Sequence, residues 1–214
     1  MSKCHRETIT CPNCKTTGDY TCWDSINVDL DPENREKVKN GELFAYICPN
    51  CKRKYNIEYE TLYHDMSNRF MIQYIANPSE ERMKKYYEEL EKMKEINIKH
   101  SLNLGEKLRT TLDRNDFLEK IYIFEAGIED FYIEITKIVV IQQFCQTHQN
   151  EEMPRIYFSG IDDKNIHFST DDGRGVDIDR ELFDSISNDY EIIAPDNEFI
   201  QVDITNVMKY VREK

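Results

Sequence analysis

The feature of the sequence that most constrains its fold is a pentapeptide, Cys-Pro-Asn-Cys-Lys, that occurs twice, at residues 11–15 and 48–52. A Cys-x-x-Cys pair folds into a tight turn that points two sulfur atoms at one place, and two such turns supply the four thiolates that a tetrahedral zinc ion takes. Proline at the second position stiffens each turn by fixing φ. The repeat therefore predicts a structural zinc site, and its four ligands are Cys11, Cys14, Cys48 and Cys51.

The segment between the two motifs is unusually long for a zinc ribbon. It comprises 33 residues, from Lys15 to Ile47, whereas compact ribbons have about 15–20. An insertion must therefore loop out between the two turns. The insertion contains a predicted short helix, with Asp31 as its N-cap, Pro32 as its first residue and its end at Asn40-Gly41.

Other uses of the cysteines remain open. A single Cys-Pro-x-Cys is also the redox motif of thioredoxin-like proteins, where it lies at the start of a helix, but no helical pattern follows either copy here. Zinc is therefore the favoured interpretation, and redox chemistry, another metal or a chance repeat are the alternatives. Cys4 and His5 are adjacent and would make a poor chelate, while Cys22 and Cys145 lie beside aromatic residues and are expected to be small buried hydrophobes.

Hydrophobic periodicity predicts an α+β protein of three modules. We expect a zinc-ribbon-like module with an antiparallel sheet over residues 1–76, a helical segment packing on it over 77–149, and a small acidic α+β module over 150–214. Each boundary follows a change in pattern, from alternating residues to helical spacing and then to short strands separated by turns.

Within these modules the elements are predicted from local signals. Strands are expected over 20–28, 43–47, 55–59, 155–161, 165–170, 175–178 and 199–204. Helices are expected over 77–96, capped by Asn77, and over 128–144 and 180–187. Helical and strand propensities compete in the apolar segment 117–125, residues 98–104 are ambiguous between strand and loop, and 150–154 is predicted as a linker.

The charge balance limits the possible partners. The chain has 28 basic and 41 acidic side chains, a net charge of −13, of which residues 150–214 contribute −9 and residues 1–55 contribute +1. Such a balance disfavours broad nucleic-acid binding, because that binding depends on neutralising phosphates. The sequence shows neither a membrane-spanning apolar run nor a secretory signal, so a cytoplasmic location is expected, where cysteines favour metal over disulfides.

The chain resembles proteins with a CpXC domain, a family found mainly in bacteria, over about residues 8–145. The matching segments are the two Cys-Pro-Asn-Cys motifs, Trp23-Asp24-Ser25-Ile26-Asn27-Val28, Asp31-Pro32, Gly41, Tyr63-His64-Asp65-Met66, Glu119-Lys120-Ile121 and Ile123-Phe124. The resemblance implies zinc binding through the four motif cysteines and implies no particular activity. Lys15 and Lys52 stand where glycine often follows the second cysteine of such a turn, so each lysine must accept a strained turn or a different one.

The expected function is that of a cytoplasmic protein-binding or adaptor module with zinc as a structural staple and an as yet unknown protein partner. A zinc ribbon offers a shallow face, edge strands and exposed aromatic residues, for which Trp23 and Tyr46 are the candidates.

Two other functions remain as alternatives. The first is an enzyme, such as a hydrolase, built around His64 and Asp65, because a histidine beside a carboxylate can serve as a general base. Neighbours on a strand, however, point to opposite faces. The second is a weak nucleic-acid-binding ribbon that uses the triplet Lys52-Arg53-Lys54 with Tyr55.

Overall fold

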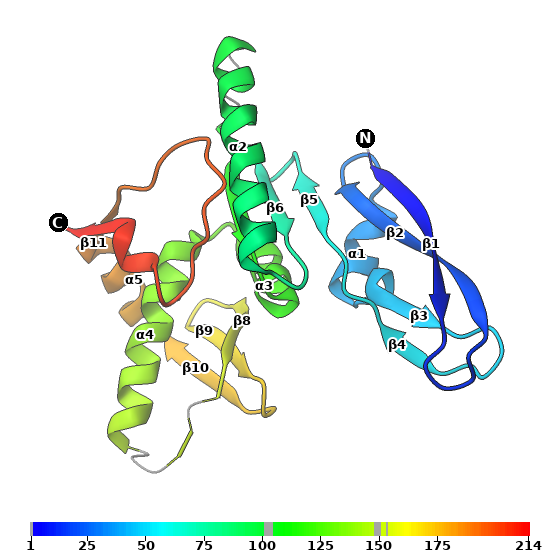
Figure 1. Cartoon of the computed structure of the whole chain (residues 1–214). Coiled ribbons are helices and arrows are strands. Elements are labelled where there is room, and N and C mark those ends of the chain that lie inside the picture. Colours follow the sequence, from blue (N-terminus) through cyan, green and yellow to red (C-terminus); the bar gives the residue numbers. More distant parts are fainter. Residues whose placement is uncertain (1, 101–104, 148–150, 153) are drawn as a thin grey trace. The chain divides into compact units, whose positions relative to one another are not determined.

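The computed structural model describes residues 2–100, 105–147, 151–152 and 154–214, and the side chains of these residues except 93–100. The chain forms two compact units, Met1–Arg114, here called the N-terminal unit, and Asn115–Lys214, here called the C-terminal unit. Helices and strands occur in both units, so the predicted α+β class is confirmed (Figure 1). The boundary between the units falls inside the predicted helical segment 77–149. The division into three modules stays a prediction, because contacts in the folded chain do not show which segments fold alone.

A five-stranded sheet with the order β1-β2-β5-β6-β7 forms the centre of the N-terminal unit. Its strands are β1 (Lys3–Thr10), β2 (Thr17–Asn27), β5 (Thr61–Asp65), β6 (Phe70–Tyr74) and β7 (Lys107–Thr111). The β1/β2 and β5/β6 pairs are antiparallel, but β2/β5 and β6/β7 are parallel, so this sheet is mixed rather than purely antiparallel as expected. Parallel neighbours need a long crossover, and the insertion between the motifs provides it for β2 and β5.

The whole crossover from β2 to β5, residues 28–60, contains a helix and a second hairpin, and the second motif forms the turn of that hairpin. Helix α1 (Glu33–Lys39) is followed by the 3-10 turn η1 (Glu42–Phe44) and by the antiparallel strands β3 (Ala45–Ile47) and β4 (Lys54–Asn56). The predicted strands 43–47 and 55–59 are therefore present but shorter than expected. The predicted α1 also differs at its start, because its first residue is Glu33 and no side chain caps it.

Helix α2 (Glu80–His100) connects β6 to β7 and starts later than predicted. Its first turn is capped by Ser79, whose Oγ accepts a hydrogen bond from the backbone N–H of Arg82 at 3.3 Å. Asn77 is not the cap: its φ is 50°, a left-handed value that asparagine tolerates, and the proline that follows it disfavours αR. Of the ambiguous segment 98–104, residues 98–100 belong to α2, and residues 101–104 lie outside the described part of the chain.

Three α-helices, one 3-10 helix and two small sheets are described in the C-terminal unit. The elements are α3 (Arg114–Glu125), α4 (Asp130–Thr147), the antiparallel sheet of β8 (Ile156–Ile161), β9 (Asn165–Thr170) and β10 (Gly175–Asp179), then α5 (Arg180–Asp189), β11 (Tyr190–Ile192), η2 (Val207–Lys209) and β12 (Val211–Glu213). The segment 117–125 is therefore helical. Its helix ends near Gly127, whose φ of 72° suits a residue without a side chain. The predicted linker 150–154 lies partly outside the described residues.

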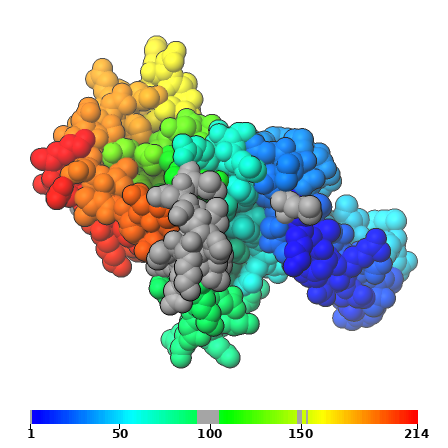
Figure 2. Space-filling model, turned by 90° about the horizontal axis from the view of Figure 1, so that it is seen from above, coloured from blue at the N-terminus to red at the C-terminus, as the bar shows by residue number. Residues whose placement is uncertain are grey.

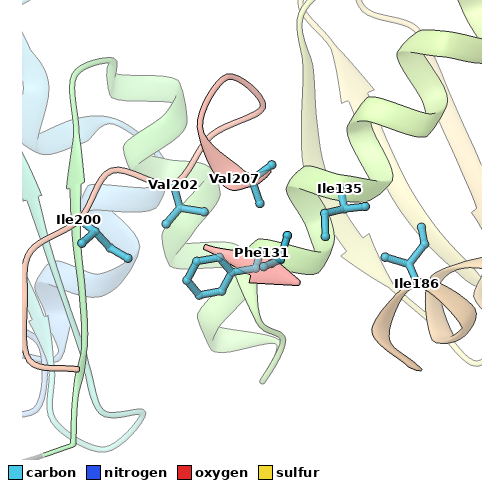
Figure 3. Close-up of a cluster of buried hydrophobic side chains, with 7 residues drawn as sticks. Phe131, Ile135, Ile186, Ile200, Val202 and Val207 are labelled. Atoms are coloured by element: carbon cyan, nitrogen blue, oxygen red, sulfur yellow. The ribbon is translucent and has the colours of Figure 1, made fainter. Parts of the chain in front are cut away.

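The C-terminal unit has its own apolar core, shown in Figure 3. Phe131 and Ile135 of α4 meet Ile186 of α5 and the apolar side chains of the segment that follows β11. The predicted strand 199–204 is wrong. Asp203 and Asn206 form a hydrogen-bonded turn there. Ile200 and Val202 before the turn are still buried in the core, although the segment does not pair as a strand along its length.

The two units differ sharply in charge. The N-terminal unit has 19 basic and 19 acidic side chains, whereas the C-terminal unit has 9 basic and 22 acidic ones. The whole net charge of −13 therefore belongs to the C-terminal unit. No helix among the described residues is long and apolar enough to cross a membrane.

Candidate metal centre

The first cysteine motif forms the turn of the β1–β2 hairpin. The N–H of Cys11 donates to the carbonyl oxygen of Thr16 at 2.9 Å, and the N–H of Lys15 donates back to the carbonyl oxygen of Cys11 at 3.0 Å. These bonds close the turn tightly, so the side chains of Cys11 and Cys14 emerge from the same side of it.

The second motif repeats this arrangement in the turn of the β3–β4 hairpin. The N–H of Cys48 donates to the carbonyl oxygen of Arg53, and the N–H of Lys52 donates to the carbonyl oxygen of Cys48, both at 3.0 Å. The two hairpins lie side by side with their turns at the same end (Figure 1), and Asn50 of the second turn donates to the hydroxyl of Thr16 in the first at 3.2 Å. Two identical pentapeptides therefore fold into two equivalent turns that face each other.

The four cysteine side chains meet between these turns. All four Sγ atoms lie within 4.8 Å of one another, and the sulfurs of Cys11 and Cys51 are 3.6 Å apart, while those of Cys14 and Cys48 are 3.5 Å apart. A tetrahedron of sulfurs at about 2.3 Å from a central zinc ion has edges of about 3.8 Å. The spacing and the all-sulfur donor set both fit a tetrahedral metal ion, and none of the four cysteines is in a disulfide.

The protein environment shifts the pKa values of the Cys14 and Cys48 thiols in opposite directions. The hydroxyl and the backbone N–H of Thr16 lower the pKa of Cys14 to about 5. The Cys51 N–H lowers the pKa of Cys48, but burial and the neighbouring Cys14 and Cys11 sulfurs together raise it to about 11. Four sulfurs this close cannot all carry a negative charge without a compensating cation, which is the role of a bound metal ion.

Both lysines that follow the motifs adopt the strained conformation that the sequence raised as one possibility. The φ angles are 61° for Lys15 and 58° for Lys52, in the left-handed region that favours glycine. The turn geometry requires this conformation, because the same residue must donate its N–H to the carbonyl oxygen of the first cysteine.

Replacement of Lys52 by glycine is therefore expected to raise the free energy of unfolding of the metal-loaded protein by about 0.5 kcal/mol, since relief of left-handed strain exceeds the added entropy of the unfolded chain. Lys54→Gly is the matched control: Lys54 lies in β4, and glycine in a strand costs about 0.5–1 kcal/mol. Denaturant unfolding measures both effects, and a loss of stability in Lys52→Gly as large as in Lys54→Gly would contradict the assigned strain.

Aromatic side chains support the four-cysteine centre from inside the unit. The hydroxyl of Tyr55 lies 3.6 Å from the Cys11 sulfur, and the ring of Tyr46 is buried beside the centre. Tyr20 and Tyr59 both donate to the carbonyl oxygen of Leu43, at 2.5 and 2.8 Å. These bonds tie the start of the second hairpin to β2 and so fix the two turns relative to each other.

The structure separates His64 from Asp65. The His64 imidazole is 2.8 Å from a carboxylate oxygen of Glu106 on one face of β5, near Asn27. Asp65 is fully buried on the opposite face, where Arg35 donates to it at 2.7 Å. The two side chains do not converge, so the structure does not support the alternative of an enzyme built around this pair.

The basic triplet is exposed, but Tyr55 and Tyr46, the aromatic residues expected to bind beside it or to dock a protein, are not. Lys52, Arg53 and Lys54 are exposed, whereas Tyr55 is half-buried against the cysteine centre and cannot offer its ring to a nucleic-acid base. Tyr46 is only 3% exposed, so its expected role as an exposed docking residue is wrong. It points inward, on the face of β3 opposite to the exposed Ile47.

Sequence reasoning missed the exposed neighbour of the second motif. Ile47, on β3, has 59% of its surface exposed. The strand pattern contains the signal, since a residue next to an inward-facing Tyr46 must point outward.

Of the other cysteines, Cys22 is buried as predicted, but Cys145 is exposed near the end of α4.

Fold and site together define a mixed α+β protein in which two hairpin turns bring four cysteines into one cluster able to hold a metal ion. The model of the CpXC protein family matches residues 9–137, more than half of the chain, and the chain belongs to that family. No curated protein and no solved structure matches the chain. The family match includes both cysteine motifs and ends within α4.

Proposed function

We propose that the N-terminal unit is a cytoplasmic protein-binding module whose fold is stapled by one structural zinc ion, held by Cys11, Cys14, Cys48 and Cys51. The observation that carries the proposal is the meeting of four sulfur atoms from two distant turns within 4.8 Å. Four thiolates in this arrangement favour zinc and leave no coordination position for water or substrate, which is typical of structural sites.

The proposed location is the reducing cytoplasm of a bacterial cell. Four free thiols at this spacing persist in such a compartment, whereas an oxidising one would convert them into disulfides. Occurrence of the family mainly in bacteria supports the same assignment.

The proposed docking surface lies beside the second motif. Ile47 is strongly exposed on β3. Trp23, the other candidate from the sequence, is partly exposed on β2, but it alternates with the buried Cys22 and so points away from the cluster that contains Tyr46. In Figure 2 the residues of β1, in dark blue, form part of the outer surface of the same unit. Because the N-terminal unit has no net charge, an apolar contact with a protein fits it better than neutralisation of phosphates.

The variant Ile47→Asp tests this assignment, since a charge at the centre of an apolar contact is expected to abolish capture of the partner while leaving the metal in place. Leu30→Asp is the matched control, because Leu30 of the same unit is 60% exposed but lies in the turn after β2. The measurement is affinity capture with quantification of bound metal, at low salt and at about 1 M salt, where charge interactions are screened beyond about 3 Å.

The expected result is a partner that is retained at high salt by the wild type and by Leu30→Asp and lost by Ile47→Asp. Equal capture by all three proteins would contradict the docking surface. Capture that disappears at high salt and after nuclease treatment would instead support the nucleic-acid alternative through Lys52, Arg53 and Lys54.

A further inference from the structure

The C-terminal unit contains a group of charged side chains in its interior. They lie on the facing sides of α3 and α4, and each is at most 6% exposed. The members are Glu119, Lys120, Asp130, Glu134 and Lys137. Charged groups are almost never buried unless they are paired, so the pattern of pairing decides their charge states.

The five groups form an alternating chain. Lys120 lies 3.0 Å from Asp130 and 2.8 Å from Glu134, and Lys137 lies 3.2 Å from Glu134 and 2.6 Å from Glu119. Glu134 is therefore the central group, and a carboxylate stands at each end. Three carboxylates face two ammonium groups, which leaves one negative charge in excess inside the unit.

The arrangement of ion pairs identifies Glu119 as the carboxylate whose protonation removes this excess negative charge. Glu134 is paired with both lysines, and Asp130 is both paired with Lys120 and placed at the N-terminus of α4, where the helix dipole favours a negative charge. Glu119 has Lys137 as its single ammonium partner within the chain of five. With a proton on Glu119, the remaining four charges cancel.

The hydrogen bonds of Glu119 are compatible with that proton. Its Oε1 accepts from the backbone N–H of Phe158 in β8, and its Oε2 faces Lys137. A proton on Oε2 leaves the bond to Phe158 in place. Lys137 then keeps Glu134, which already accepts from it through both carboxylate oxygens.

Asp203, Asp116 and Arg155 are charged neighbours of the group. Asp203, from the turn before η2, interacts with Lys120 and adds negative charge. Asp116 and Arg155, from α3 and the start of the β8 hairpin, pair with each other at 3.1 Å and are partly exposed. Together, these three neighbouring side chains add no net positive charge to the group.

We propose that Glu119, at the end of the buried chain of ion pairs, is a proton-binding site whose deprotonation makes the C-terminal unit lose stability as the pH rises. Burial raises the pKa of Glu119 to about 7, with Lys137 opposing and Glu134 reinforcing that shift. A carboxyl group whose pKa is higher in the folded than in the unfolded state destabilises the fold once the pH rises through the window between the two values. The window here runs from about 4.5 to about 7.

Native-state hydrogen exchange of the full, zinc-loaded chain tests the proposal, read at amides of α3, α4 and β8 so that loss of zinc in the other unit does not enter. Between about pH 5 and about pH 8 the protection factors, corrected for intrinsic exchange, are expected to fall by roughly 10- to 100-fold. Glu119→Gln, which imitates the protonated form, is expected to remove this dependence, and Glu151→Gln, at an exposed position, to leave it unchanged.

A second measurement does not depend on a variant that folds. The side-chain carboxyl ¹³C resonance of Glu119 in the wild type is expected to titrate with a midpoint near neutral pH. A midpoint close to the ordinary value for glutamate would overturn the proposal, as would a pH dependence of protection that persists unchanged in folded Glu119→Gln.

Discussion

Replacement of Cys48 by serine is expected to unfold the paired hairpins β1–β2 and β3–β4. The buried cluster that joins the two hairpins is small and includes two of the metal ligands, Cys11 and Cys48, so we expect the metal to contribute much of the free energy that holds the turns together. Structural zinc sites contribute about 10–16 kcal/mol of apparent binding free energy, which acts as folding free energy, and loss of one of four thiolates removes much of it.

The single tryptophan of the chain reports this change, because Trp23 lies in β2. Its fluorescence maximum is expected to shift to that of a solvent-exposed indole in Cys48→Ser, and in the wild type after removal of zinc by a strong chelator. Cys145→Ser is the matched control, since Cys145 is exposed in the C-terminal unit. An unchanged Trp23 signal and melting temperature in Cys48→Ser would refute the structural role of the metal.

Replacement of Lys120 by methionine is expected to cost about 3–5 kcal/mol of unfolding free energy in the C-terminal unit. Methionine is similar in length but leaves Asp130 and Glu134 buried, with Asp130 deprived of its lysine partner at 3.0 Å. Removal of one partner from a buried ion pair strands an uncompensated charge, which costs far more than loss of an exposed pair.

Lys209→Met provides the comparison, because Lys209 is an exposed lysine of the same unit and its loss is expected to change stability by less than about 0.5 kcal/mol. Urea unfolding followed by helical circular dichroism, with hydrogen exchange at α3 and α4, measures both variants. Equal stability of the two variants would show that the buried chain of charges contributes nothing to the unit.

The metal centre was accessible to sequence reasoning because its information is local and repeated. Two identical pentapeptides specify two equivalent turns, and the chemistry of four thiols specifies that the turns meet. Strands with a clear local pattern could also be predicted, such as β2 beside the metal centre and β9 in the C-terminal unit, whose predicted positions are close to those in the structure.

Other parts of the N-terminal unit were not accessible in the same way. Strand β1 is exposed along nearly its whole length, so it lacks the alternation that marks a half-buried strand, and it is held by pairing with β2. Likewise, neighbouring positions suggested that His64 and Asp65 act together, but the alternation of β5 gave them separate partners.

The buried charges of the C-terminal unit show a further limit. Glu119, Lys120, Glu134 and Lys137 lie in helices whose sequence pattern places charged residues at the surface. Their burial results from contacts between α3 and α4 that are 14 to 18 residues apart in sequence, and helical periodicity does not encode such pairings. The turn at Asp203 overrides strand propensity over 199–204 for a related reason, since side-chain hydrogen bonds decide its conformation.

X-ray absorption at the zinc edge, combined with elemental analysis of protein purified under reducing conditions, tests the central assignment most directly. One zinc ion per chain, surrounded by four sulfur atoms at about 2.3 Å, is the predicted result. A metal-free protein with four intact thiols and an unaltered fold, or a coordination shell with nitrogen or oxygen in place of any of the four sulfurs, would contradict it.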